Sequence, residues 1–149
     1  MDEAAVSGYI TTTFGGVETG TVDDNIFYFH GPEHMFPFAT LMTNDDNDNA
    51  SALNRPGVFR LNIGVGKPTF RAIIGGSSPA PNADNADEEA NAYDFTALDQ
   101  LLPHPVYGKM SWVCILNPSA TTFATVVQPL LAEAYEIAVG RETRRLARA

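Results

Sequence analysis

The chain has 149 residues and a formal net charge of −9, with 18 acidic residues against 9 lysines and arginines. This length fits one domain, and 44% hydrophobic residues are enough for a sizeable core. Because affinity for a phosphate backbone comes mostly from lysine and arginine, the acidic balance argues against a general nucleic-acid binder.

The composition also predicts where the protein works. One cysteine, Cys114, excludes an internal disulfide framework and is typical of a reducing compartment. The N-terminal residues lack the basic start and apolar stretch of a signal peptide, and no apolar run is long enough for a transmembrane helix. We therefore expect a cytoplasmic protein that does not enter the membrane.

The N-terminal third predicts one helix and two strands. Apolar residues at helical spacing, with acids in the first turn, predict a helix over 2–14 that Gly15-Gly16 ends. β-forming residues predict strands over 22–30 and 38–43. Because Gly31-Pro32 is a strong turn signal, we expect these two strands to form an antiparallel hairpin.

The middle of the chain has the clearest strand. Residues 58–65 alternate, so that one face is apolar and the other carries Arg60 and Asn62, which could meet solvent or a ligand. A polar loop over 44–57 precedes this strand, and a short helix over 68–74 follows it.

The C-terminal half predicts one more strand and a long helical region. The acidic run over 77–92 is too polar to pack and predicts a mobile loop, followed by a short helix over 93–102. An apolar run predicts a strand over 110–116. After Pro118 the pattern is helical, and Pro129 should either kink one helix or separate a short helix from a longer one.

Together these elements predict a single α+β domain over residues 1–140. Its mainly antiparallel sheet would have four or more strands, with the N- and C-terminal helices packed on one face. Residues 141–149 would form a basic C-terminal helix end or tail. Its arginines, at helical spacing, could touch nucleic acid or an acidic partner, although complementing a helix C-terminus is the commoner use. These arginines are Arg141, Arg144, Arg145 and Arg148.

The stretch GVGKPT resembles a phosphate-binding loop but lacks its essential residues. Leu61 stands where the first glycine of that motif belongs, and Pro68 stands where a serine or threonine should follow Lys67. We interpret the stretch as a bend between strand and helix. The alternative is that Lys67 and free backbone N–H groups hold an anion at the helix start.

The run PHPVYGKMSWVC brings His104 and Tyr107 close to Trp112. A histidine can shuttle protons, and Asp94 or Asp99 could orient it, but the spacing places neither carboxylate beside it. Cys114 lies within an apolar run and is interpreted as an inert thiol.

Metal sites are not indicated by the sequence. His30 and His34 have no convincing third ligand, and the acidic run after Asn44 fails the calcium-loop pattern. We therefore predict no catalytic residue, no metal and no cofactor.

Four phrases resemble an uncharacterised bacterial family, the domain-of-unknown-function family numbered 6194. They are FPFATLMT at Phe36, RPGVFRLNIGVG at Arg55, YDFTALDQLLPHPVYG at Tyr93 and SWVCILNPS at Ser111. A more distant likeness is to the MmcQ/YjbR-like proteins. It is carried by Trp112-Val113 and by Leu130-Leu131 with Tyr135, and it implies an antiparallel sheet with helices on one side. Neither resemblance implies catalytic residues, and the acidic charge argues against the DNA-binding role suggested for the wider group.

Our leading hypothesis is a non-enzymatic binding domain, for a small-molecule ligand or a protein partner, and a homodimer is compatible with it. The candidate ligand surface is Arg60, Asn62, His104 and Tyr107. The alternatives are a small hydrolase or isomerase that uses His104 as acid or base, and nucleic-acid binding through the arginine tail.

Overall fold

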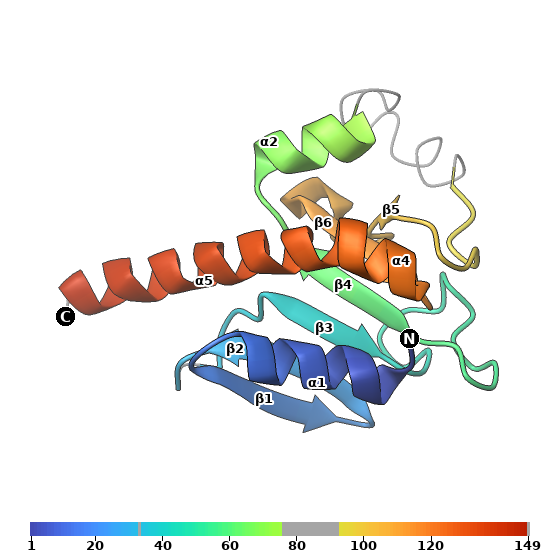
Figure 1. The fold of residues 1–149 in the computed structure, drawn as a ribbon, viewed down its shortest axis with the longest axis horizontal. Helices are drawn as coiled ribbons and strands as arrows, with labels where there is room; N and C mark the ends of the chain where they lie inside the picture. The colour runs from blue at the N-terminus through green and yellow to red at the C-terminus, as the bar shows by residue number, and fades with distance from the viewer. Residues whose placement is uncertain (33, 76–92, 149) are drawn as a thin grey trace.

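The computed structural model describes residues 1–32, 34–75 and 93–148. One six-stranded antiparallel sheet, in the order β1-β2-β3-β4-β6-β5, carries helices at both ends of the chain (Figure 1). The strands are β1 (Val17–Val22), β2 (Asn25–His30), β3 (Ala39–Met42), β4 (Arg60–Gly64), β5 (Leu102–Pro103) and β6 (Trp112–Leu116). The α-helices are α1 (Glu3–Thr13), α2 (Lys67–Phe70), α4 (Ala120–Thr122) and α5 (Gln128–Arg148). The predicted α+β fold, with a mainly antiparallel sheet and terminal helices, is therefore confirmed.

Helices α1 and α5 cover the same face of the sheet and bury its apolar side chains (Figure 1). Helix α1 starts after Asp2, because the Asp2 carboxylate accepts the backbone N–H of Ala5 at 2.8 Å. The core cluster joins the strands to both helices. It includes Val6 and Ile10 from α1, Leu61 and Ile63 from β4, Val113 and Ile115 from β6, and Leu131 and Ala134 from α5.

The segment that follows α1 contacts helix α5 beside this core. The ring of Phe14, just after α1, stacks on Tyr135 of α5 with ring centroids 4.8 Å apart. The hydroxyl of Tyr135 also donates to the carbonyl of Gly15 at 2.6 Å. Both contacts hold α5 against the start of β1.

The predicted strand over 22–30 is wrong in one respect, because this segment belongs to a hairpin of two strands. Asp23 and Asp24 have positive φ values of 51° and 68° and form a two-residue turn between β1 and β2. The sequence VETGTV of β1 has few strong β-formers, which is why the sequence patterns did not identify it. The antiparallel pairing of β2 with β3 is confirmed.

Residues 93–102 do not form the predicted short helix. Leu98 makes an isolated bridge to Leu116, and the segment ends in β5 (Leu102–Pro103). Pairing with the buried strand β6 therefore outweighs the weak local helical pattern.

The region after Pro118 is helical without a break from Ala120 to Arg148, so Pro129 does not separate two helices. Helix α4 is followed by a five-residue π-helical turn, η3 (Phe123–Val127), and then by the long helix α5. Pro129 directly follows this π-helical turn, and such a turn is one of the places where a helix can lack a regular backbone hydrogen bond.

Two further predictions concern the basic C-terminal residues and the acidic loop. Helix α5 runs without interruption through Gly140 to Arg148, so the basic residues form the end of a helix. The predicted mobile acidic loop over 77–92 lies outside the described residues. Among the residues that are described, no helix has the length and apolar character needed to cross a membrane.

Gly31, at the start of the β2–β3 turn, generates the first testable prediction. It has a φ of +82°, and a Cβ atom there would collide with the Glu142 carboxylate, which pairs with His30 Nδ1. Gly31→Ala should lower the free energy of unfolding by about 1–3 kcal/mol, because backbone strain adds to displacement of Glu142.

Gly57→Ala is the matched control, since Gly57 has a φ of +75° but nothing within 4 Å of the added Cβ atom. It should cost only the conformational strain, about 1 kcal/mol. Urea unfolding of both variants measures the difference in their free energies of unfolding. Equal losses of stability would show that the Glu142 side chain moves aside at no cost.

Candidate functional site

The second face of the sheet, opposite α1 and α5, carries a row of polar side chains. In the strand register Thr40 of β3 lies opposite Asn62 of β4, which lies opposite Cys114 of β6. Arg60 lies two residues before Asn62 on the same face and is only 1% exposed. A buried guanidinium needs partners for its charge and for its N–H groups.

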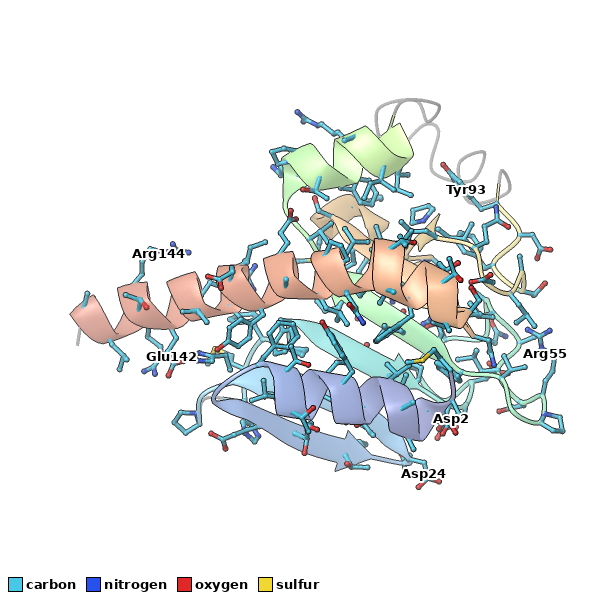
Figure 2. All side chains as sticks on the ribbon, viewed as in Figure 1. Asp2, Asp24, Arg55, Tyr93, Glu142 and Arg144 are labelled. Atoms are coloured by element: carbon cyan, nitrogen blue, oxygen red, sulfur yellow. The ribbon has the colours of Figure 1, made fainter. Side chains whose placement is uncertain are left out.

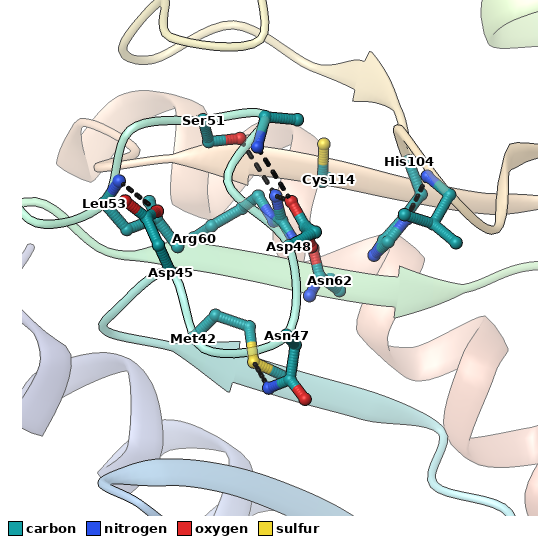
Figure 3. Close-up of polar contacts among 12 residues, drawn as sticks. Met42, Asp45, Asn47, Asp48, Ser51, Leu53, Arg60, Asn62, His104 and Cys114 are labelled. Carbon is teal, nitrogen blue, oxygen red and sulfur yellow. Dashed lines mark hydrogen bonds and ion pairs between the residues drawn. The ribbon is translucent and has the colours of Figure 1, made fainter.

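The loop between β3 and β4, residues 43–59, supplies two of those partners, and β4 itself supplies a third. Asp48 accepts from Arg60 Nη1 at 2.9 Å and from Nη2 at 2.6 Å, which makes a bidentate ion pair (Figure 3). Ser51 Oγ accepts a further bond from Nη1 at 2.9 Å, and Asn62 Oδ1 accepts from Nε at 2.9 Å. Asn62 in turn donates to Thr40 Oγ1 at 2.9 Å. These five residues are called the Arg60 cluster below.

The Arg60 cluster fastens the β3–β4 loop to the sheet. Leu53 of the loop packs with Met42 and Leu116 in a small apolar cluster beside it. Burial alone would raise the pKa of Asp48, but the hydrogen bonds and charge of Arg60 outweigh burial, so the pKa lies below its ordinary value. The carboxylate is therefore charged at neutral pH, where it forms an ion pair with Arg60.

His104 lies beside the cluster, and its ring accepts hydrogen bonds from the backbone of the turn that follows it. Its Nδ1 atom accepts the backbone N–H groups of Val106 at 3.0 Å and Tyr107 at 2.9 Å. This arrangement requires a neutral ring with its proton on Nε2. Burial, and then the charge of Arg60, lower the pKa of His104 to about 4, although the Asp48 carboxylate partly opposes them.

The candidate ligand residues therefore do not form one open surface. Arg60, Asn62 and His104 are buried, and the first two are bonded within the Arg60 cluster, whereas Tyr107 is half exposed. The Tyr107 ring lies against His104 with centroids 5.0 Å apart. Whether any of the four residues binds a ligand stays a prediction.

The carboxylates suggested as partners of His104 are engaged elsewhere. Asp94 accepts the backbone N–H and the hydroxyl of Thr96, and Asp99 accepts the backbone N–H of Ser119 at 2.8 Å. Cys114 donates weakly to the Pro103 carbonyl at 3.6 Å, and burial raises the pKa of its thiol to about 12. This geometry gives no support to acid–base or nucleophilic catalysis on this face.

The GVGKPT stretch already holds an anion, and that anion belongs to the chain itself. The Glu133 carboxylate of α5 accepts the backbone N–H of Gly66 at 2.8 Å and the hydroxyl of Thr69 at 2.5 Å. Gly64 is required for another reason, because a Cβ atom there would lie 2.8 Å from the Trp112 ring. The two glycines thus serve internal packing and helix capping.

A groove that the sequence analysis did not identify lies between α5 and the β2–β3 turn. Its volume is about 370 Å³. The turn contributes the exposed side chains of Met35 and Phe36, and α5 contributes Ala138 and the arginines. The full lining is His30, Met35, Phe36, Ala138, Arg141, Glu142, Arg144 and Arg145, and it is called the α5 groove below.

Helical spacing explains how α5 builds its wall. Ala138, Arg141, Glu142 and Arg145 lie three or four residues apart, so they share one face of the helix. Figure 2 shows Glu142 on the side of α5 that faces the sheet, where it pairs with His30, and Arg144 on the opposite side in this view. Two sequence features could have indicated this groove. One is the repeat of arginines near the C-terminus, and the other is the apolar pair Met35-Phe36 within a turn.

Metal coordination finds no support in the described part of the chain. In residues 1–32, 34–75 and 93–148, no group of three or more His, Cys, Asp or Glu side chains is placed to hold a metal ion.

The Arg60 cluster generates the second prediction. Asp48→Leu leaves a buried guanidinium without its counter-charge, and should lower the free energy of unfolding by roughly 3 kcal/mol. The double variant Asp48→Leu/Arg60→Met removes both charges, and should lose clearly less than the sum of its single variants. Urea unfolding of the cycle measures the coupling, and additive losses would show that the pair is not coupled.

His104 generates the third prediction. Its folded pKa of about 4 lies below the ordinary value of 6.5, so the unfolded chain binds a proton that the folded chain excludes. Stability should therefore fall as the pH drops from 6.5 to 4, by up to about 3 kcal/mol. His104→Asn keeps an acceptor for the turn and should remove this pH dependence. Urea unfolding across the window tests it, and an NMR titration of His104 at its ordinary pKa would contradict it.

A model of a family of unknown function, DUF6194, matches residues 1–147. No curated protein and no solved structure matches the chain. The likeness to the MmcQ/YjbR-like proteins therefore stays a prediction.

Proposed function

Because the chain belongs to the DUF6194 family, whose function is unknown, its role must be argued from its own residues, and we propose a non-enzymatic binding domain. The ligand is a small amphipathic anion that lies in the α5 groove. The observation that carries this proposal is an apolar groove of about 370 Å³ with arginines along its helical wall. Its volume lies within the range typical of small-molecule sites, roughly 300–1,000 Å³.

The apolar part of the groove favours a ligand with a hydrocarbon or aromatic body. Met35 is 68% exposed and Phe36 is 66% exposed, although both are large apolar side chains on one turn. Burying them against a ligand removes apolar surface from water, at about 25 cal/mol per Å². Methionine is also adaptable in shape, which suits a binding surface.

The charged part favours a carboxylate or a similar anion. Arg141 and Arg145 lie on the groove face of α5, one helical turn apart. Guanidinium groups bind carboxylates through paired hydrogen bonds. The one acidic side chain of the lining, Glu142, already pairs with His30, so it opposes an anion less than a free carboxylate would. Arginines gathered here on a chain of net charge −9 support selective binding of an anion.

The same groove explains why nucleic acid is a weaker candidate. The arginines flank an apolar wall of limited volume, whereas a nucleic-acid surface needs a basic stripe that follows many phosphates. Catalysis is also less well supported, because the Nε2 edge of His30 faces Gly16. A Cβ atom at Gly16 would lie 3.2 Å from that nitrogen.

The fourth prediction tests this function with decanoate as the probe and with decanol and decylamine as uncharged and cationic probes of equal chain length. Decanoate should bind best in isothermal titration calorimetry, because only it satisfies both parts of the groove. Arg141→Gln should weaken decanoate binding roughly 10-fold or more through loss of a charged hydrogen bond. Met35→Ser should weaken decanoate and decanol alike, because it removes apolar contact.

Two matched controls keep this test specific. Arg71→Gln changes another exposed arginine, and Met110→Ser changes a methionine that is 69% exposed, away from the groove. Neither control should alter binding. Equal affinity for decanoate and decanol, or equal effects of the groove and control variants, would overturn the proposal.

A further inference from the structure

The two edges of the sheet are protected very differently. At one edge β5 has two residues, and one of them is Pro103, which has no backbone N–H to offer. At the other edge β1 has six residues, VETGTV, with no proline, no lysine and one charge. Short strands, prolines and lysines are the devices by which proteins keep sheet edges from pairing. The β1 edge has none of them.

The hairpin turn decides which backbone groups of β1 face outward. The two-residue turn at Asp23 and Asp24 makes Val22 and Asn25 a hydrogen-bonded pair, so the even-numbered residues of β1 bond to β2. The bond from Gly31 N to Gly16 O at 3.0 Å follows the same alternation. The N–H and C=O groups of Val17, Thr19 and Thr21 therefore point away from β2, and no described residue bonds to them.

These outward groups are self-complementary. An antiparallel copy of β1 centred on Thr19 places Thr19 opposite Thr19 and Val17 opposite Thr21, so all three outward residues pair. It also places Glu18 opposite Gly20. A register shifted by two residues toward the N-terminus would instead place Glu18 opposite Glu18, and like charges directly opposite are destabilising. Shifting the other way loses one of the outward pairs.

The surroundings of β1 leave room for such a copy. An antiparallel pair has its twofold axis perpendicular to the sheet, so both copies keep α1 on the same face. The exposed side chains of α1 are short, namely Ala4, Ala5, Thr11, Thr12 and Thr13. A Cβ atom added at Gly8 would have no neighbour within 4 Å. In Figure 1, β1 is the lowest strand of the sheet, and no described segment lies below it in this view.

We propose that two copies of this chain join through their β1 edges into one continuous sheet, with the twofold axis at Thr19. The partner is thus a second copy, and the interface is an isologous strand pair. It lies on a different part of the fold from the α5 groove and does not depend on the function proposed for that groove.

Single cysteine variants of the full chain test the register. In the proposed dimer Thr19→Cys faces itself in a hydrogen-bonded pair, with Cα atoms about 5.5 Å apart, within the range for a disulfide. Under mild oxidation Thr19→Cys should form a covalent dimer readily, whereas Glu18→Cys, which faces Gly20, should not. Thr21→Cys should cross-link only when mixed with Val17→Cys. The native Cys114 is buried and gives the background in the unmodified chain.

Sedimentation of the unmodified chain gives the second measurement. The chain should sediment as a dimer at micromolar concentration, and Thr19→Pro should shift it to monomer, because the lost N–H serves only the interface. Thr21→Lys is the second variant if proline disturbs the hairpin, and circular dichroism confirms that each variant is folded. A monomeric unmodified chain at all concentrations overturns the proposal. So does a dimer that both variants leave unchanged, or equal cross-linking at residues 18 and 19.

Discussion

The bidentate bond between Arg60 and Asp48 determines what one whole face of the sheet can do. Arg60 carries a charge at the start of the buried strand β4, and the β3–β4 loop brings Asp48 and Ser51 to its guanidinium. Because the loop must cover the guanidinium, it also covers Asn62 and Thr40. Polar residues that interrupt an apolar sheet can thus be buried and bonded to a covering loop, instead of forming a binding surface.

The other polar sites singled out in the sequence are also satisfied within the chain. Glu133 satisfies the helix start at Gly66, and two backbone N–H groups satisfy His104 Nδ1. The α5 groove differs, because Met35 and Phe36 are exposed although they are apolar. A buried polar group with an internal partner is accounted for by the fold, whereas the exposed apolar side chains beside arginines are the feature on which we base the proposed ligand site.

The sequence predicts those parts of the fold that depend on local pattern. The strand around Ile63 follows from alternation and the hairpin turn at Gly31 from turn chemistry, whereas α1 follows from helical spacing with acids in the first turn. β1 was missed because its stability comes from pairing with β2 and not from its own residues. The burial of Arg60 could not be foreseen, because it depends on Asp48, which lies twelve residues away in a segment without periodicity. The α5 groove depends on two segments more than a hundred residues apart.

The contacts between Tyr135 and the segment at Phe14 and Gly15 join the last helix to the first. Strands β1 to β4 pair with their neighbours in sequence order, so these four can assemble while the chain is still being made. Their apolar face, however, is completed by Leu131 and Ala134, which come near the end. In a growing chain α1 can therefore cover only part of this face until α5 has been made, and translation order makes α5 the element that completes the core.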